Sequence, residues 1–276
     1  MPSLDNEDIE ISLLLEAIFL KYGYDFRAYQ RPSLKRRVLH RLSMEGLESI
    51  SHMQNRLLND VAFCERLILD LTINVTEMFR DPSFYLALRR KVIPSLRAFP
   101  FLRIWLAGMS TGEEVYSVAI SLKEEDLYKR SKVYATDVNE VVLERAREGI
   151  FPVDCMRKYT KNYQRAGGLE SFSSYYTAHY DSVIMDRSLK DNVTFASHNL
   201  VTDSGFGEMH LIFCRNVLIY FDRQLQDLVL GLFRDSLCDG GFLCLGSKET
   251  IEFSRVCDDF HAIVPEEKIY RKKGLS

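Results

Sequence analysis

Residues 102–120 read LRIWLAGMSTGEEVYSVAI, and this stretch decides the fold. Ile104 to Ala107 is an apolar run of the length of a buried strand, and a turn of small residues from Gly108 to Gly112 follows it. Apolar side chains then recur at helical spacing, at Val115, Val118, Ala119 and Leu122. The sequence therefore predicts a strand, a tight loop and a helix, which is the unit of an α/β fold.

The predicted loop suits a ligand that carries no phosphate. Its glycines allow the backbone to approach a ligand closely, and a helix N-terminus presents free N–H groups. Glu113 and Glu114 come next, where they would repel a phosphate, and the loop lacks both the lysine of a Walker loop and the pattern G-x-G-x-x-G. A ligand with hydroxyls and a cationic centre, such as S-adenosylmethionine, fits better. An ordinary turn whose acids complement the helix dipole explains the same residues.

A second strand, Val133 to Thr136, ends at Asp137 and is followed by a helix from Val141 to Glu148. In doubly wound folds an acid at the end of the second strand binds the ribose hydroxyls of a nucleoside. Asp137 stands at that position. The alternative is that Asp137 caps the helix that follows.

Residues 1 to about 75 carry apolar side chains at helical spacing, which predicts an all-helical N-terminal domain. Within it, the segment RPSLKRRVLHRL gathers four cations, at Lys35, Arg36, Arg37 and Arg41. Such a cluster is either a solvated helix face or a docking site for an acidic partner helix.

The segment NVTEMFRDPSFY, residues 74–85, is unusual for a linker. Asn74 and Thr76 offer hydrogen-bonding groups, and Asp81 followed by proline is a typical helix start. Arg80 is not explained by a linker role. It is either a surface charge or a clamp for a carboxylate.

Residues 150–195 interrupt the alternation of strands and helices and are rich in tyrosine, which indicates an insertion with short antiparallel strands at TAHYDSVIM and NVTFA. The alternation resumes with a strand from Leu211 to Cys214, just before Arg215 and Asn216. A helix follows, then a turn at Asp239-Gly240-Gly241, a strand from Phe242 to Leu245, and a closing hairpin in HAIVPEEKIYRKK.

The composition restricts the function classes. The chain has 276 residues, 46% of them hydrophobic, and a net charge of −3, so the bulk charge does not favour nucleic acid. No apolar run reaches the ~20 residues that span a bilayer, and the acidic N-terminus is unlike a signal peptide, so we expect a cytoplasmic protein without membrane insertion. The cysteines and histidines show no metal-ligand spacing, so we expect reduced thiols and no metal.

Several stretches together resemble the CheR family, the chemoreceptor glutamate methyltransferases. They run in the family's order over roughly residues 30–250 and are NVTEMFRDPSF, IWLAGMSTGEEVYSVAI, VYATDVNEVVLERAREGIF, FASHNL, LIFCRNVLIYFD and DGGFLCLGSKE. The resemblance implies an all-helical domain at 1–75, a Rossmann-like class I methyltransferase domain at 76–276, and a small antiparallel β-subdomain inserted at 150–195.

The resemblance also implies a cofactor, a substrate and site residues. The cofactor is S-adenosylmethionine, and the product is a glutamate methyl ester on the cytoplasmic helices of a chemoreceptor, made by a protein we expect to be a monomer. The residues implied around the cofactor are Asn74, Thr76, Arg80, Glu114, Asp137, Asn199, Leu200, Arg215 and Asn216. Arg80 and Tyr220 would face the methyl-transfer site. The alternatives are methylation of another acceptor and a non-catalytic signalling role for the same fold.

Overall fold

The computed structural model describes residues 5–72 and 76–274. Contacts within the chain form two units. One contains the described residues up to 72 together with Ile219–Gln226, and the other contains 76–218 and 227–274. In the described part of the chain, no helix combines the length and apolarity needed to cross a membrane.

The described residues of the first unit up to 72 form four α-helices, which confirms the predicted all-helical domain. Ser49 and Asp60 cap two of them by accepting the N–H groups of His52 and Phe63. The apolar side chains predicted from helical spacing form its buried core. The helices are α1 (Asn6–Tyr22), α2 (Arg31–Met44), α3 (Ile50–Asn59) and α4 (Val61–Leu71).

The segment Ile219–Gln226 belongs to this helical unit, although it lies far along the chain. The backbone N–H of Gln30 donates to the carbonyl of Tyr220 at 2.8 Å. The rings of Tyr29 and Phe221 meet edge to face with centroids 4.9 Å apart. Sequence order alone would have placed this segment with its neighbours in the second unit.

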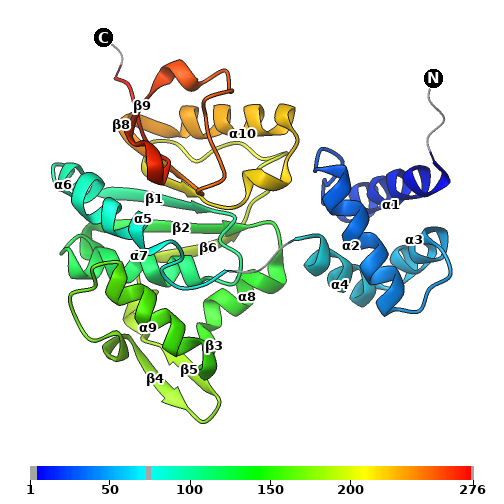
Figure 1. The fold of residues 1–276 in the computed structure, drawn as a ribbon, viewed down its shortest axis with the longest axis horizontal. Helices are drawn as coiled ribbons and strands as arrows, with labels where there is room; N and C mark the ends of the chain where they lie inside the picture. The colour runs from blue at the N-terminus through cyan, green and yellow to red at the C-terminus, as the bar shows by residue number, and fades with distance from the viewer. Residues whose placement is uncertain (1–4, 73–75, 275–276) are drawn as a thin grey trace. The chain divides into compact units, whose positions relative to one another are not determined.

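The second unit is organised around a seven-stranded sheet in the order β6-β2-β1-β7-β8-β10-β9 (Figure 1). The first five of these strands run parallel, and β10 pairs antiparallel with both β8 and β9. The strands are β1 (Leu102–Ala107), β2 (Ser131–Asp137), β6 (Val193–Ser197), β7 (Met209–Cys214), β8 (Leu237–Leu245), β9 (Phe260–Val264) and β10 (Ile269–Lys272).

The strand order contains a reversal of the kind at which doubly wound folds bind ligands. From β1 the chain builds outward through β2 and β6, and it then returns to the other side of β1 with β7. Such a reversal is the switch point of a doubly wound fold, and ligands bind there, beyond the carboxyl ends of the strands. The predicted α/β class is confirmed.

Helices connect the strands at the predicted places. The helix after β1 is α7 (Glu113–Glu124), and the helix after β2 is α8 (Glu140–Glu148). The remaining helices are α5 (Pro82–Ala87), the π-helical turn η1 (Leu88–Val92), α6 (Ile93–Leu96), α9 (Met156–Arg165) and α10 (Arg223–Ser236). Short 3-10 turns are η2 (Tyr128–Arg130), η3 (Val153–Cys155), η4 (Phe172–Tyr175), η5 (Arg187–Leu189), η6 (Leu218–Tyr220), η7 (Cys257–Asp259) and η8 (Pro265–Glu267).

The insertion contains a small antiparallel sheet in the order β3-β5-β4, seen beside α9 in Figure 1. Its strands are β3 (Ile150–Pro152), β4 (Tyr176–His179) and β5 (Ser182–Met185). The short antiparallel strands predicted at TAHYDSVIM are confirmed as β4 and β5. The placement of NVTFA in the insertion is wrong, because β6 pairs parallel with β2 in the main sheet. Strand propensity favours a strand but does not select its neighbour.

The turn predicted at Asp239-Gly240-Gly241 is also wrong. Strand β8 runs through these residues, with Gly240 in the left-handed region at φ 74°. Its pairing with β7 shifts register between Met209 and Leu211. Between these pairs β7 advances two residues and β8 advances five, so three extra residues of β8 form a bulge around Gly240 without ending the strand. The closing hairpin is confirmed as β9 and β10.

Candidate functional site

The loop after β1 is folded against the end of β2. The N–H groups of Gly108 and Met109 both donate to the carbonyl of Thr136, at 2.9 and 3.0 Å. A Cβ on Gly108 would lie 2.6 Å from a methyl carbon of Val217, so only glycine allows this approach. The loop therefore lies directly at the switch point, between the ends of β2 and β7.

Asp137 is the buried acid at the end of β2, with 8% of its surface exposed. Its carboxylate accepts the N–H groups of Ser110 at 2.9 Å and Asn139 at 3.0 Å. Burial raises the pKa of Asp137, while these hydrogen bonds oppose the rise. The side chain that caps α8 is Asn139, which accepts the N–H of Val141, so capping does not explain Asp137.

The segment after β6 contacts the end of β2 at Asp137. The backbone N–H of His198 donates to the carbonyl of Asp137 at 3.1 Å. Asn199 forms a local turn in which its side-chain oxygen accepts the N–H of Val201 at 2.9 Å. Leu200 is buried beside it. The ends of β1, β2 and β6 thus converge on one region.

Arg215, directly after β7, is the charged centre of the site. Its side chain is 3% exposed and forms ion pairs with Glu114 at 3.0 Å and Asp81 at 2.8 Å. The guanidinium also packs over the ring of Phe84, 4.0 Å from its centroid, and donates to the carbonyl of Arg80 at 3.4 Å. Glu114 therefore binds Arg215 and does more than complement the helix dipole.

A second buried acid, Glu249, holds the segment that carries Asn216, and the sequence analysis did not select it. Its carboxylate accepts the N–H groups of Asn216 at 3.0 Å, Val217 at 2.8 Å and Gly246 at 2.5 Å. Asn216 itself has a positive φ of 62°. Glu249 is the last residue of DGGFLCLGSKE, one of the stretches that carry the family resemblance, so this stretch could have identified it as a site residue.

The segment before α5 is strained. Phe79 and Asp81 have positive φ values of 52° and 57°, which non-glycine residues rarely adopt. The N–H of Phe79 donates to the buried hydroxyl of Ser117 at 2.8 Å, which holds this conformation. Helix α5 starts after Asp81 as predicted, but the Asp81 side chain pairs with Arg215 and makes no cap. Strain of this kind is concentrated at functional sites.

The structure places most of the predicted cofactor residues in the second unit. The members of this group are Thr76, Arg80, Glu114, Asp137, Asn199, Leu200, Arg215 and Asn216. Asn74 lies outside the described residues. Tyr220 belongs to the helical unit, where the guanidinium of Arg37 lies 5.1 Å from the centroid of its ring.

Most of the predicted docking cations on α2 have partners inside the helical unit. Lys35 pairs with two acids of α1, and Arg41 pairs with Asp70. Arg37 is 8% exposed and donates to a carbonyl at the end of α4. Arg36 is exposed.

The residues of the site fit S-adenosylmethionine. Asp137 offers a buried acceptor at the strand end where ribose hydroxyls bind in doubly wound folds. The loop 108–112 contains no cation, and Arg215 already pairs with two carboxylates, so neither offers the uncommitted positive charge that a phosphate requires.

Two family models match this chain. The model described as CheR methyltransferase, all-alpha domain, matches residues 9–72. The model described as CheR methyltransferase, SAM binding domain, matches residues 74–264.

Curated proteins are similar over most of the chain. The putative methyltransferase Cher3 of Pseudomonas putida is 54% identical over 99% of this chain and 100% of its own length. The chemotaxis protein methyltransferase of Escherichia coli is 30% identical, covering 88% of this chain and 84% of its own. A chemotaxis protein methyltransferase of Listeria innocua is also 30% identical, covering 83% and 85%.

Proposed function

Because this chain belongs to the CheR methyltransferase family, we propose that it methylates glutamate side chains on the cytoplasmic helices of a chemoreceptor. The chain is an S-adenosylmethionine-dependent methyltransferase of chemotaxis adaptation. One observation carries the proposal for its site: Asp137, the loop 108–112 and Arg215 meet at the switch point of the sheet.

The site residues take distinct roles in this proposal. Asp137 binds the ribose hydroxyls of the cofactor, and Arg215 keeps Glu114 and the segment of Arg80 in place through its buried contacts. The other residues proposed to line the cofactor site are Asn74, Thr76, Asn199, Leu200 and Asn216. Arg80 and Tyr220 face the methyl-transfer site.

The proposed reaction needs alignment more than acid–base catalysis. The cofactor supplies an electrophilic methyl group on a sulfonium. A glutamate carboxylate, with an ordinary pKa of about 4.3, is already ionised at neutral pH and needs no general base. Arg80 orients this carboxylate and Tyr220 borders the methyl group. Tight binding of the substrate by Arg80 would stabilise the ground state, so its contribution lies in geometry.

The chemical nature of the product tests the proposed function. The protein is incubated with methyl-labelled S-adenosylmethionine and a purified receptor cytoplasmic fragment, and the labelled fragment is then treated with mild base. We expect the label to leave as volatile methanol, because carboxylate methyl esters hydrolyse in base. Label that stays on the fragment after this treatment indicates a nitrogen or sulfur acceptor and refutes the glutamate assignment.

Asp137→Ala is expected to weaken cofactor binding by about 1–3 kcal/mol, the range for a hydrogen bond to a charged group. Titration calorimetry measures this directly. Because burial raises the pKa of Asp137, acidification should weaken binding to the wild type from a pH above the ordinary aspartate value of 3.8. Asp258→Ala, which removes an exposed acid of the same unit, is the control and should bind normally. Equal affinity of the two variants would remove Asp137 from the ribose site.

The remaining parts of the proposal concern organisation and partners. We assign residues 1–75, together with Ile219–Gln226, to a helical domain and the rest of 76–276 to the methyltransferase domain, in a cytoplasmic monomer. The insertion begins at residue 150 and ends before β6. The grouping of contacts into two units supports the division between the two domains. The proposed docking surface on α2 consists of Lys35, Arg36, Arg37 and Arg41. Exposed Arg36 makes the direct contact with the receptor, and Arg37 positions Tyr220 through its contact with the ring.

A further inference from the structure

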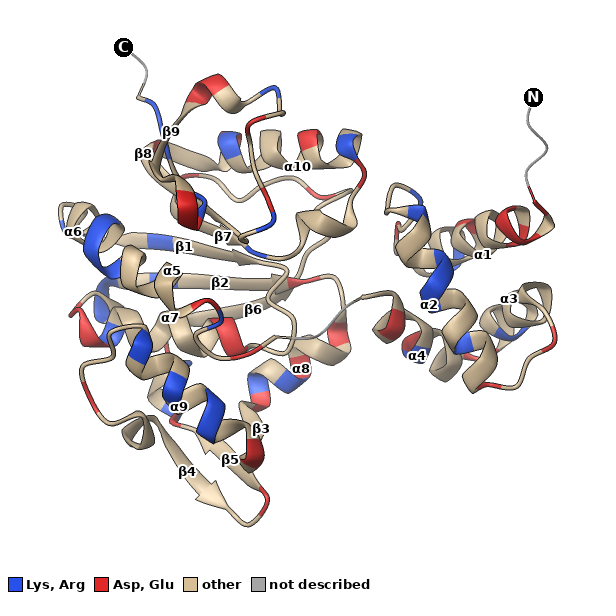
Figure 2. Cartoon of the chain, viewed as in Figure 1, with Lys and Arg blue, Asp and Glu red and all other residues tan. Residues whose placement is uncertain are grey.

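Helix α9 carries a concentrated positive charge in a protein whose net charge is −3. Its sequence, MRKYTKNYQR, contains four cations and no acid. Figure 2 shows these blue positions along α9, in the second unit. All four side chains are exposed, and we name them the basic stripe: Arg157, Lys158, Lys161 and Arg165.

Most of the basic stripe is not neutralised by the protein itself. Lys158 pairs with Glu77, whereas no ion pair to Arg157, Lys161 or Arg165 occurs within the described ranges 5–72 and 76–274. This differs from α2, where three of the four predicted docking cations are buried or paired. A cation without an internal partner keeps its charge available for a partner molecule.

The buried side chains of α9 contact the segment that contains Arg80. The side-chain amide of Asn162 donates to the carbonyl of Met78 at 3.1 Å. The rings of Tyr163 and Phe79 meet edge to face with centroids 5.2 Å apart. The basic stripe therefore lies on the helix that packs directly against residues 76–80 of the proposed methyl-transfer site.

We propose that the basic stripe binds the acidic helix on which the acceptor glutamates lie. This inference rests on the proposed function, since it takes the substrate to be an anionic helix. Arg157, Lys161 and Arg165 are four residues apart, so they share one helix face over about 12 Å. Carboxylates repeating at helical spacing on a partner match this arrangement, and complementary charge raises the association rate and fixes the register.

The chemistry of α9 favours an acidic helix over an anionic membrane. A helix that lies in a membrane interface presents large apolar side chains together with its cations. On α9 the large apolar and aromatic side chains, Met156, Tyr159 and Tyr163, are buried inside the unit. The exposed face thus offers charge without an apolar anchor.

Charge reversal tests the basic stripe. The triple variant Arg157→Glu, Lys161→Glu and Arg165→Glu is compared with wild type for binding to a fluorescently labelled chemoreceptor cytoplasmic fragment, measured by anisotropy. We expect the Kd at low salt to rise about tenfold or more, since three exposed attractions become repulsions. The difference should shrink in about 1 M salt, where the Debye length is ~3 Å.

A scattered variant with the same change in net charge is the matched control. Lys129→Glu, Arg145→Glu and Lys273→Glu reverse three exposed cations elsewhere in the second unit and should bind the fragment normally. Cofactor affinity by calorimetry should be unchanged in both variants, which reports an intact fold. A receptor fragment whose acceptor glutamates are changed to glutamine should bind the wild-type enzyme more weakly. With this fragment, the Kd values of wild type and the stripe variant should be nearly equal.

The outcomes separate this inference from the proposed function. Binding of the fragment without methyl-ester formation would remove the proposed substrate chemistry and leave the basic stripe supported. Wild-type binding by the stripe variant, or equal losses in stripe variant and control, would overturn the docking role of α9. Salt-sensitive binding of wild type to anionic lipid vesicles with no binding to the fragment would also overturn it.

Discussion

Replacing Arg80 by alanine is expected to lower the single-turnover rate of methyl transfer by about a hundredfold, the cost of a reacting group misplaced by ~1 Å. The site is built to hold the backbone of this residue. The carbonyl of Arg80 accepts a hydrogen bond from the guanidinium of Arg215. The residues on either side, Phe79 and Asp81, have backbone φ angles in the left-handed region. Quenched-flow measurement with saturating cofactor and receptor fragment isolates the chemical step from binding.

Two further variants show what Arg80 contributes. Arg80→Lys keeps the charge but loses the planar fork, so it should recover only part of the rate if Arg80 orients a carboxylate in two contacts. Tyr220→Phe keeps the ring that faces Arg37 and removes only the hydroxyl, so it should slow turnover more than it weakens cofactor binding. Wild-type single-turnover rates in Arg80→Ala would show that this arginine has no part in alignment.

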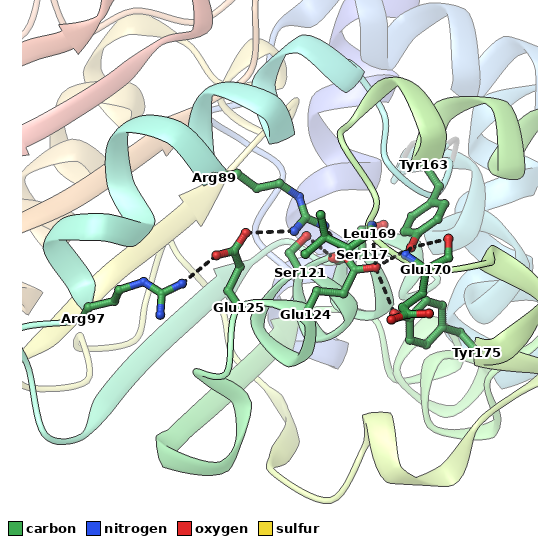
Figure 3. A network of polar contacts seen from close by, with 10 residues as sticks. All are labelled: Arg89, Arg97, Ser117, Ser121, Glu124, Glu125, Tyr163, Leu169, Glu170 and Tyr175. Atoms are coloured by element: carbon green, nitrogen blue, oxygen red, sulfur yellow. Dashed lines mark hydrogen bonds and ion pairs between the residues drawn. The ribbon is translucent and has the colours of Figure 1, made fainter.

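The second large effect concerns stability and arises at the end of α7, where Glu124 is the centre of a buried polar network (Figure 3). Glu124 pairs with Arg89 of η1, and these side chains are 2% and 6% exposed. The Glu124 carboxylate also accepts the hydroxyls of Tyr163 and Tyr175 and the N–H of Leu169. One carboxylate therefore joins the helix after the strained segment to the inserted residues.

The tyrosines of this network keep their protons at neutral pH, and the hydroxyl of Tyr163 also accepts the N–H of Glu170 at 2.9 Å. Burial raises the pKa of Tyr163 to about 12 and raises the pKa of Tyr175 as well. Both hydroxyls remain protonated and donate to Glu124. Loss of that acceptor leaves several donors without their charged partner.

Glu124→Gln is expected to reduce the free energy of unfolding by about 3 kcal/mol, because buried Arg89 loses one of its two carboxylate partners, Glu124 and Glu125, and three further donors lose a charged acceptor. Urea denaturation followed by circular dichroism measures the change. Glu144→Gln, which breaks an exposed ion pair with Arg147, is the control and should change stability by less than about 1 kcal/mol. Equal unfolding free energies for Glu124→Gln and its control would contradict this role of the network.

The sequence by itself determined most of the elements and led to the prediction of where the cofactor binds. Apolar periodicity and a glycine turn are local signals, so the strand, loop and helix of residues 102–124 follow from neighbouring residues alone. Asp137 was found in the same way, because an acid at the end of a second strand has a fixed place in a doubly wound sheet. The stretches typical of the family supplied the chemistry that these local signals left open.

Only the tertiary structure decided which side chains act together and which charges remain available. Arg215 and Asp81 are 134 positions apart, and Glu249 holds Asn216 across 33 positions, so no local pattern could pair them. The same holds for charge. Among neighbouring cations of α2, Arg37 is buried and Arg36 is exposed, whereas α9 keeps its cations at the surface. Burial depends on what packs against a helix, and that partner comes from distant parts of the chain.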